Sequence, residues 1–133
     1  VDNFKKYNDH YGHPAGDECL RRVAECLQKE VDAVNADQTA PGAFVARYGG
    51  EEFSVIIPDA PHGVHAGIAL GLIEAVAGMQ IPHVENAGYG VVTISVGTIC
   101  MTPASGAVKL LFRRTDELLY QAKENGRNRV EFL

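Results

Sequence analysis

Hydrophobic residues recur along this chain with two different periods, and these periods predict its helices and strands. Apolar positions three or four residues apart predict three amphipathic helices, which begin near Ala15, Pro61 and Ala107. Apolar runs rich in β-branched residues predict strands at residues 43–46, 53–57, 91–99 and 129–133. Gly126 follows the last helix at its expected C-cap position.

The remaining segments complete an element order. Residues 1–4 are expected to be the tail of a strand, residues 5–14 a polar connection, and residues 32–42 a loop. The predicted order is therefore β-α-β-β-α-β-α-β. Such an order favours an α+β fold with a mostly antiparallel central sheet flanked by helices. This is the ferredoxin-like arrangement that nucleotide-cyclase and polymerase palm domains use.

Composition restricts the class of protein. The 133 residues are 46% hydrophobic and 22% charged, which is typical of one globular domain over 1–133. The net charge of -5 argues against a nucleic-acid binder, and the absence of long apolar runs argues against membrane contact. Cys19 and Cys26 lie about 10 Å apart on a predicted helix, too far for a disulfide. Reduced cysteines favour a cytoplasmic location.

The segment between the second and third predicted strands carries the candidate chemistry. Gly49 and Gly50 favour a hairpin turn, because glycine reaches positive φ without steric cost. Glu51 and Glu52 follow directly, and two adjacent carboxylates favour a nearby cation. Oxygen ligands of this kind suit Mg²⁺. The alternative interpretation is a solvated hairpin tip with surface glutamates.

Four blocks of sequence, in order along nearly the whole chain, resemble the GGDEF-domain diguanylate cyclases. They are Asp2-Asn3-Phe4-Lys5-Lys6-Tyr7-Asn8-Asp9 with Gly12-His13 and Gly16-Asp17, Arg47-Tyr48-Gly49-Gly50-Glu51-Glu52-Phe53, Thr93-Ile94-Ser95-Val96-Gly97, and Asp116-Glu117-Leu118-Leu119-Tyr120-Gln121-Ala122-Lys123 with Gly126-Arg127-Asn128. The resemblance implies a nucleotidyltransferase of bacterial signalling that joins two GTP molecules into cyclic di-GMP and releases pyrophosphate. It also implies Mg²⁺ or Mn²⁺ as cofactor and a homodimer in which two active sites face each other.

The resemblance assigns roles to the catalytic and metal-binding positions. Glu51 corresponds to a metal-binding carboxylate that also accepts a proton, and Lys5 to a lysine that stabilises charge in the transition state. Glu52 is expected to bind a second metal ion, with a structural role in the turn as the alternative. Val1 would bind metal through its backbone carbonyl. The other carboxylate of the family's metal site would fall immediately before Val1, so we expect the chain to begin inside its first strand.

Further positions correspond to residues that bind substrate. These are Asn8, His13, Asp17, Gly49, Gly50, Lys123 and Arg127. Asn8 and Asp17 would bind guanine, and Asp17 favours GTP over ATP because a carboxylate only accepts hydrogen bonds. Lys123 and Arg127 would bind phosphates, although cations at a helix C-terminus also have a purely electrostatic explanation. Asp17 and His13 have structural alternatives as well.

Two other patterns lead to expectations about the site. Arg47 and Asp116 are expected to form an ion pair that joins the hairpin to the last helix. The histidines at 62, 65 and 83 lack the spacing of metal ligands and are interpreted as surface or structural residues. Residues 40–43 lack the Arg-x-x-Asp motif by which many relatives bind their product, so we expect no feedback inhibition there.

Three functions follow from these motifs. The first is the catalytic domain of a diguanylate cyclase, joined in its parent protein to an N-terminal sensory or dimerising domain. The second is a degenerate GTP-binding regulatory module without turnover. The third, a cyclase that also uses ATP, is disfavoured by Asp17.

Overall fold

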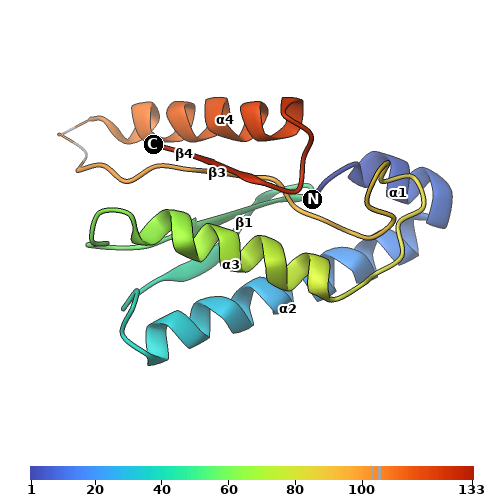
Figure 1. The fold of residues 1–133 in the computed structure, drawn as a ribbon, viewed down its shortest axis with the longest axis horizontal. Coiled ribbons are helices and arrows are strands. Elements are labelled where there is room, and N and C mark those ends of the chain that lie inside the picture. Colours follow the sequence, from blue (N-terminus) through green and yellow to red (C-terminus); the bar gives the residue numbers. More distant parts are fainter. Residues whose placement is uncertain (103, 105) are drawn as a thin grey trace.

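The protein has the α+β architecture expected from its sequence (Figure 1). The computed structural model describes residues 1–102, 104 and 106–133. In chain order the elements are α1 (Phe4–Tyr11), α2 (His13–Ala36), β1 (Phe44–Gly49), β2 (Glu52–Ile56), α3 (Val64–Gly78), β3 (Val96–Thr98), α4 (Val108–Glu124) and β4 (Val130–Phe132). The three long helices begin within three residues of their predicted starts.

The strands lie between helices (Figure 1). Helices α2 and α3 pack on each other, and α4 packs against β3 and β4 from the opposite side. Leu20, Val23 and Leu27 of α2 and Leu72 and Val76 of α3 are buried in the main core. These residues recur every three or four positions, so the helical period of the sequence directly specifies this interface.

Four strands form two separate pairs. β1 and β2 form an antiparallel hairpin with Phe44 opposite Ile56 and an irregularity between Arg47 and Gly49. β3 and β4 pair in parallel. Among the described residues no strand hydrogen-bonds to both pairs. Residues of β2 and β3 line one cavity of about 680 Å³ between them.

The beginning of the chain differs from the sequence prediction. Residues 1–3 contain no strand, and most of the predicted polar connection is helix α1. Phe4 and Tyr7 are buried and Tyr11 packs against the core, which is a helical i, i+3, i+7 pattern. Lysines and an asparagine lie between these apolar residues, so the sequence did not predict a helix here. Similarly, α2 continues to Ala36 into the predicted loop.

The strand predicted at residues 91–99 is much shorter in the structure. Only Val96–Thr98 forms strand β3, while Val91 makes an isolated antiparallel bridge to Pro82. Thr93 O accepts a hydrogen bond from the Asp2 amide at 2.9 Å. The β-branched run is therefore extended, but its partners are loop segments. Within the described ranges, no helix combines the length and apolar character needed to cross a bilayer.

Candidate functional site

Arg47 of β1 stabilises the hairpin turn between β1 and β2. Gly50 has φ 54°, a conformation that glycine adopts at little cost. Arg47 donates from Nε and Nη2 to the Gly50 carbonyl at 3.0 and 2.7 Å. The expected Arg47–Asp116 ion pair is wrong, since no ion pair in the described part of the chain joins them. The Arg47 side chain loses less conformational freedom by bonding to a carbonyl three residues away than by bonding to Asp116 on a distant helix.

This turn places two carboxylates beside the first residue of the chain. Glu51 and Glu52 are half-buried, and the Val1 backbone nitrogen donates to the Glu51 carbonyl at 3.2 Å. Val1, Glu51, Glu52 and Lys123 all line the cavity between β2 and β3. The structure thus brings the three predicted metal-binding residues together with one predicted phosphate-binding cation.

The donor atoms at this place suit a hard cation. The described residues contain no cluster of three or more His, Cys, Asp or Glu side chains that could hold a metal. Two carboxylates and a backbone carbonyl remain as candidate ligands. Mg²⁺ is usually bound by one or two carboxylates, with water and substrate phosphates completing its coordination. Glu51, Glu52 and Val1 therefore fit a metal shared with a phosphorylated substrate.

The predicted guanine-binding residues lie at a second place, where α1 meets α2. Asn8 belongs to α1 and Asp17 to the first turns of α2. The Oδ1 atom of Asn8 is buried and has no hydrogen-bond donor within the described residues. A buried amide oxygen without a donor is costly, and the N–H groups of guanine are donors. Asp17 and His13 are exposed.

Gly16 was not recognised from the sequence as a determinant of this place. A Cβ atom at Gly16 would lie 1.7 Å from Asn8 Oδ1 and 3.3 Å from the Phe4 ring. Because Gly16 has no side chain, the Asn8 side chain lies directly against α2. The contact is at the residue immediately before Asp17. The sequence feature that could have identified Gly16 is the Gly-Asp pair within a predicted helix. A glycine inside a helix costs stability, so its presence suggests that another group of the protein approaches it closely.

The predicted phosphate-binding cations lie on three elements. Lys123 ends α4 and is half-buried, and Arg127 follows in the loop before β4. Arg127 has φ 65°, and its amide donates to the Ala122 carbonyl at 2.9 Å. Lys5 is exposed on α1. No hydrogen bond or ion pair among the described residues links Lys5 to the carboxylates of the hairpin.

The cavity next to the carboxylates is mainly apolar. Besides Val1, Glu51, Glu52 and Lys123, its walls include core residues such as Leu27 and the polar residues Asp59, His65 and Asp116. The unpaired edges of β2 and β3 both line it. An apolar space between two open strand edges suits a further strand better than a triphosphate.

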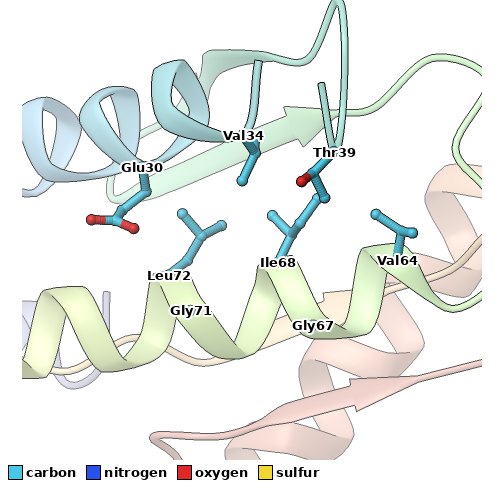
Figure 2. Close-up of a pocket in the computed structure, with 8 residues that line it drawn as sticks. All are labelled: Glu30, Val34, Thr39, Val64, Gly67, Ile68, Gly71 and Leu72. Carbon is cyan, nitrogen blue, oxygen red and sulfur yellow. The ribbon is translucent and has the colours of Figure 1, made fainter. Parts of the chain in front are cut away.

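A second hollow lies between α2 and α3 (Figure 2). Its volume is about 370 Å³, and its wall on α3 includes Gly67 and Gly71. Glu30 is its one ionisable side chain among the described residues, and no predicted site residue lines it. Its described lining contains no cation that could bind a phosphate.

Histidines and cysteines outside the site have structural surroundings. His65 and His83 are buried, and their Nε2 atoms lie 3.0 Å from Leu133 O and 3.1 Å from Asn3 O. These positions agree with the structural interpretation. The three cysteines are free thiols. Burial raises the pKa of the Cys19 and Cys26 thiols, which makes them poor nucleophiles.

An α+β frame with paired carboxylates on a Gly-Gly hairpin defines a domain of the nucleotide-cyclase class. The chain belongs to the GGDEF family: the family model "Diguanylate cyclase, GGDEF domain" matches residues 1–129. It is 38% identical over 130 residues to the response regulator PleD of Caulobacter vibrioides. It is 36% identical over 130 residues to the diguanylate cyclase DgcM of Escherichia coli. Each match covers 98% of this chain but only 27% and 28% of the relative.

Solved structures show the same fold. The structure of the coiled coil and GGDEF domain of DgcB from Caulobacter crescentus, in complex with c-di-GMP, matches with a TM-score of 0.80 at 30% identity. That match covers 99% of this chain and 65% of the other. The active GGEEF domain of a diguanylate cyclase from Vibrio cholerae matches with a TM-score of 0.79 at 29% identity, over 99% and 77% of the two chains. The predicted family and fold class are therefore confirmed.

Proposed function

We propose that this chain is the catalytic domain of a diguanylate cyclase that joins two GTP molecules into the second messenger cyclic di-GMP. The observation that carries the proposal is that Val1, Glu51, Glu52 and Lys123 line one cavity and that Val1 contacts Glu51 directly. Oxygen ligands and a cation placed together are what a nucleoside triphosphate and its metal require. Family membership supports the same reaction.

The reaction proposed is phosphoryl transfer between two nucleotides. The 3′-hydroxyl oxygen of one GTP forms a bond to the α-phosphorus of the other, the bond to the bridging oxygen breaks, and pyrophosphate leaves with the electron pair. Glu51 accepts the proton of the hydroxyl. Lys5, Lys123 and Arg127 stabilise charge on the phosphate oxygens. Two such transfers close the ring and release two pyrophosphates.

We assign recognition of the guanine base to the place where α1 meets α2. Asn8 and Asp17 bind the guanine edge, His13 contacts the substrate, and the backbone at Gly49 and Gly50 approaches a phosphate. The space beside both glycines is open to at least 4 Å, which leaves room for a ligand. We expect ATP to be a poor substrate, because adenine lacks the 2-amino donor that a carboxylate can bind.

Mg²⁺ or Mn²⁺ is the proposed cofactor. Glu51, Glu52 and the Val1 carbonyl would hold it together with phosphate oxygens. When bound, such an ion neutralises charge that develops on the transferring phosphate. Glu51→Gln keeps the size of the side chain but removes its charge. We expect it to abolish the shift that Mn²⁺ alone causes in the thermal midpoint of this protein.

The proposed enzyme acts as a homodimer, because each protomer holds one GTP and the two nucleotides must face each other. The chain spans about a quarter of the length of the two curated relatives described above. A sensory or dimerising domain N-terminal to this one is therefore part of the proposal. The proposed substrate, GTP, is a cytoplasmic nucleotide, which supports a cytoplasmic location for this domain.

The open edges of β2 and β3 support one more element of the proposal. A strand that precedes this segment in the parent protein would fill the apolar cavity and pair with both edges. The same strand would carry the carboxylate that the family has immediately before Val1.

A GTP-binding regulatory module is the second candidate. Its support is the small number of metal-binding groups, since no cluster of three or more occurs among the described residues. A module of this kind would bind GTP through Asn8 and Asp17 and would release no product.

Turnover of GTP with Mg²⁺ distinguishes the two candidates. We would compare this chain with one extended upstream by a strand and a helix, roughly thirty residues. Activity in the extended chain that Glu51→Ala abolishes, with little turnover of ATP, is the result expected of a cyclase. An extended chain that binds GTP yet makes no product, even when joined to a dimeric coiled coil, would establish the regulatory module.

A further inference from the structure

Asp2 is a buried carboxylate surrounded by hydrogen-bond donors. It is 1% exposed. Its Oδ2 accepts from Thr93 Oγ1 at 2.7 Å and from the Asn128 amide at 3.1 Å, and its Oδ1 accepts from Ser95 Oγ at 2.6 Å. None of the ion pairs found in the described residues includes it. A buried charge without a cation is costly, so these three donors are what allows it to remain there.

A second layer of polar groups supports these donors. Asn86 is 1% exposed and donates from Nδ2 to Thr93 Oγ1 at 3.0 Å and to the Val91 carbonyl at 2.8 Å. Its own Oδ1 accepts from Asn3 Nδ2 at 2.9 Å. The network therefore joins the first residues of the chain, the segment before β3, and the loop before β4. Connected polar networks of this kind favour one arrangement of the elements they join.

The loop before β4 is strained, and Asp2 is one of the groups that hold it. Gly126, Arg127 and Asn128 have φ values of 117°, 65° and 47°. A residue with a side chain is disfavoured in this region, asparagine less so than most. Contacts from outside the loop oppose this cost: the Asp2 carboxylate accepts from the Asn128 amide, Tyr89 Oη donates to the Gly126 carbonyl at 2.8 Å, and the Arg127 amide donates to the Ala122 carbonyl of α4 at 2.9 Å. Strain that other parts of a fold maintain is often found at functional sites.

We infer that Asp2 is a positioning residue of the active site, which keeps the Arg127 loop in its strained conformation next to the metal-binding end of the chain. Asp2 follows Val1 directly in sequence, while its side chain fixes the residue after Arg127. One carboxylate thus connects the part of the site proposed for metal with the part proposed for phosphate. This inference rests on the proposed function, because it gives Arg127 the role of binding phosphate.

Asp2→Asn tests the inference with almost no change of shape. The amide keeps one acceptor oxygen at the position of Oδ2, and its NH₂ group can donate to Ser95 Oγ. This oxygen carries no charge, so it is a weaker acceptor for the Asn128 amide than the carboxylate is. We expect faster hydrogen exchange at the Asn128 amide and about tenfold weaker binding of GTP.

A double-mutant cycle with Arg127→Ala separates positioning from general destabilisation. If Asp2 acts through Arg127, adding Asp2→Asn to Arg127→Ala weakens GTP binding no further. Additive losses, or unchanged exchange at Asn128 in Asp2→Asn, would overturn the inference. Asp32→Asn, an exposed acid on α2, is the matched control and should leave both measurements unchanged.

A milder variant keeps the test valid if Asp2→Asn does not fold. Ser95→Ala removes one of the three donors, and we expect a smaller increase in exchange at Asn128 and a few-fold loss of GTP affinity. An unchanged exchange rate in this variant would also overturn the inference. Failure of the unaltered protein to bind GTP would instead count against the proposed function, while exchange at Asn128 still decides whether Asp2 holds the loop.

Discussion

Asn8 and Gly16 lie so close together that only glycine fits at position 16. A Cβ atom there would lie 1.7 Å from Asn8 Oδ1. Single residues of this kind determine the shape of the proposed guanine site, because they decide how near one helix comes to the next. At the hairpin, Gly50 has a comparable role through its positive φ.

Gly16→Ala should disturb the proposed guanine site. The added methyl group displaces Asn8, and we expect a loss of about 1–3 kcal/mol in unfolding free energy together with weaker GTP binding. Denaturant unfolding and GTP titration measure the two effects. Gly67→Ala on α3 is the control: no atom lies within 4 Å of its Cβ position, so it should gain about 0.5–1 kcal/mol. Equal effects of the two variants would contradict this account of Gly16.

At the scale of elements, backbone contacts and buried groups determine how helices pack. A Cβ atom on Gly97 of β3 would lie 2.3 Å from Leu119 N and 2.5 Å from Thr115 O, both backbone atoms of α4. Helix α4 therefore lies directly on the strand. Because α4 ends near Lys123, this packing also decides where a predicted phosphate-binding cation lies.

Gly97→Ala should be among the most damaging small substitutions in this protein. A backbone cannot turn aside as a side chain does, so α4 must move, and we expect a loss of about 3 kcal/mol or more in unfolding free energy. Thermal or denaturant unfolding measures it. Gly71→Ala on α3 adds the same methyl group where nothing lies within 4 Å. A loss at position 97 no larger than at position 71 would refute the close packing of α4.

The packing of α1 on α2 predicts a loss of stability in alkaline solution. Burial raises the pKa of Tyr7, Cys19 and Cys26. These groups stay protonated in the folded protein at pH values where they ionise in the unfolded chain. The unfolded state then binds fewer protons, so stability is full below the ordinary thiol pKa and falls as pH rises through it.

Urea unfolding at about pH 7.5 and about pH 9.5 tests this expectation. We expect a lower midpoint at the higher pH. In Cys26→Ala, which removes one of the two thiols on α2, the decrease should be smaller. A midpoint that does not change between the two pH values would show that these groups are not buried as the structure describes.

At the scale of the whole molecule, the proposed activity depends on parts that one protomer does not supply. The cavity between β2 and β3 is open at two strand edges, and the proposed reaction needs a second nucleotide on a second protomer. The matched region covers only 27–28% of the length of three curated relatives. Regulation is therefore expected to come from association and from neighbouring domains.

Feedback by product is one kind of regulation that we expect to be absent. Residues 40–43 are Ala-Pro-Gly-Ala, so neither an arginine nor an aspartate is available to bind cyclic di-GMP at that spacing. Micromolar cyclic di-GMP should leave the initial rate of the extended chain unchanged. Strong inhibition would show that another surface of the protein binds the product.

The sequence alone determined the family, the three long helices and the hairpin with its paired carboxylates, because periodic hydrophobicity and turn chemistry act over a few residues. Tertiary structure decided what depends on distant contacts. Asp2 and Asn128 are 126 positions apart, so no local pattern could show that one fixes the other. Arg47 hydrogen-bonds within its own hairpin. Helix α1 forms in a segment that the sequence predicted to be a polar connection, although one of its faces is buried. In each case the deciding free energy comes from burial and from partners that only the folded chain brings together.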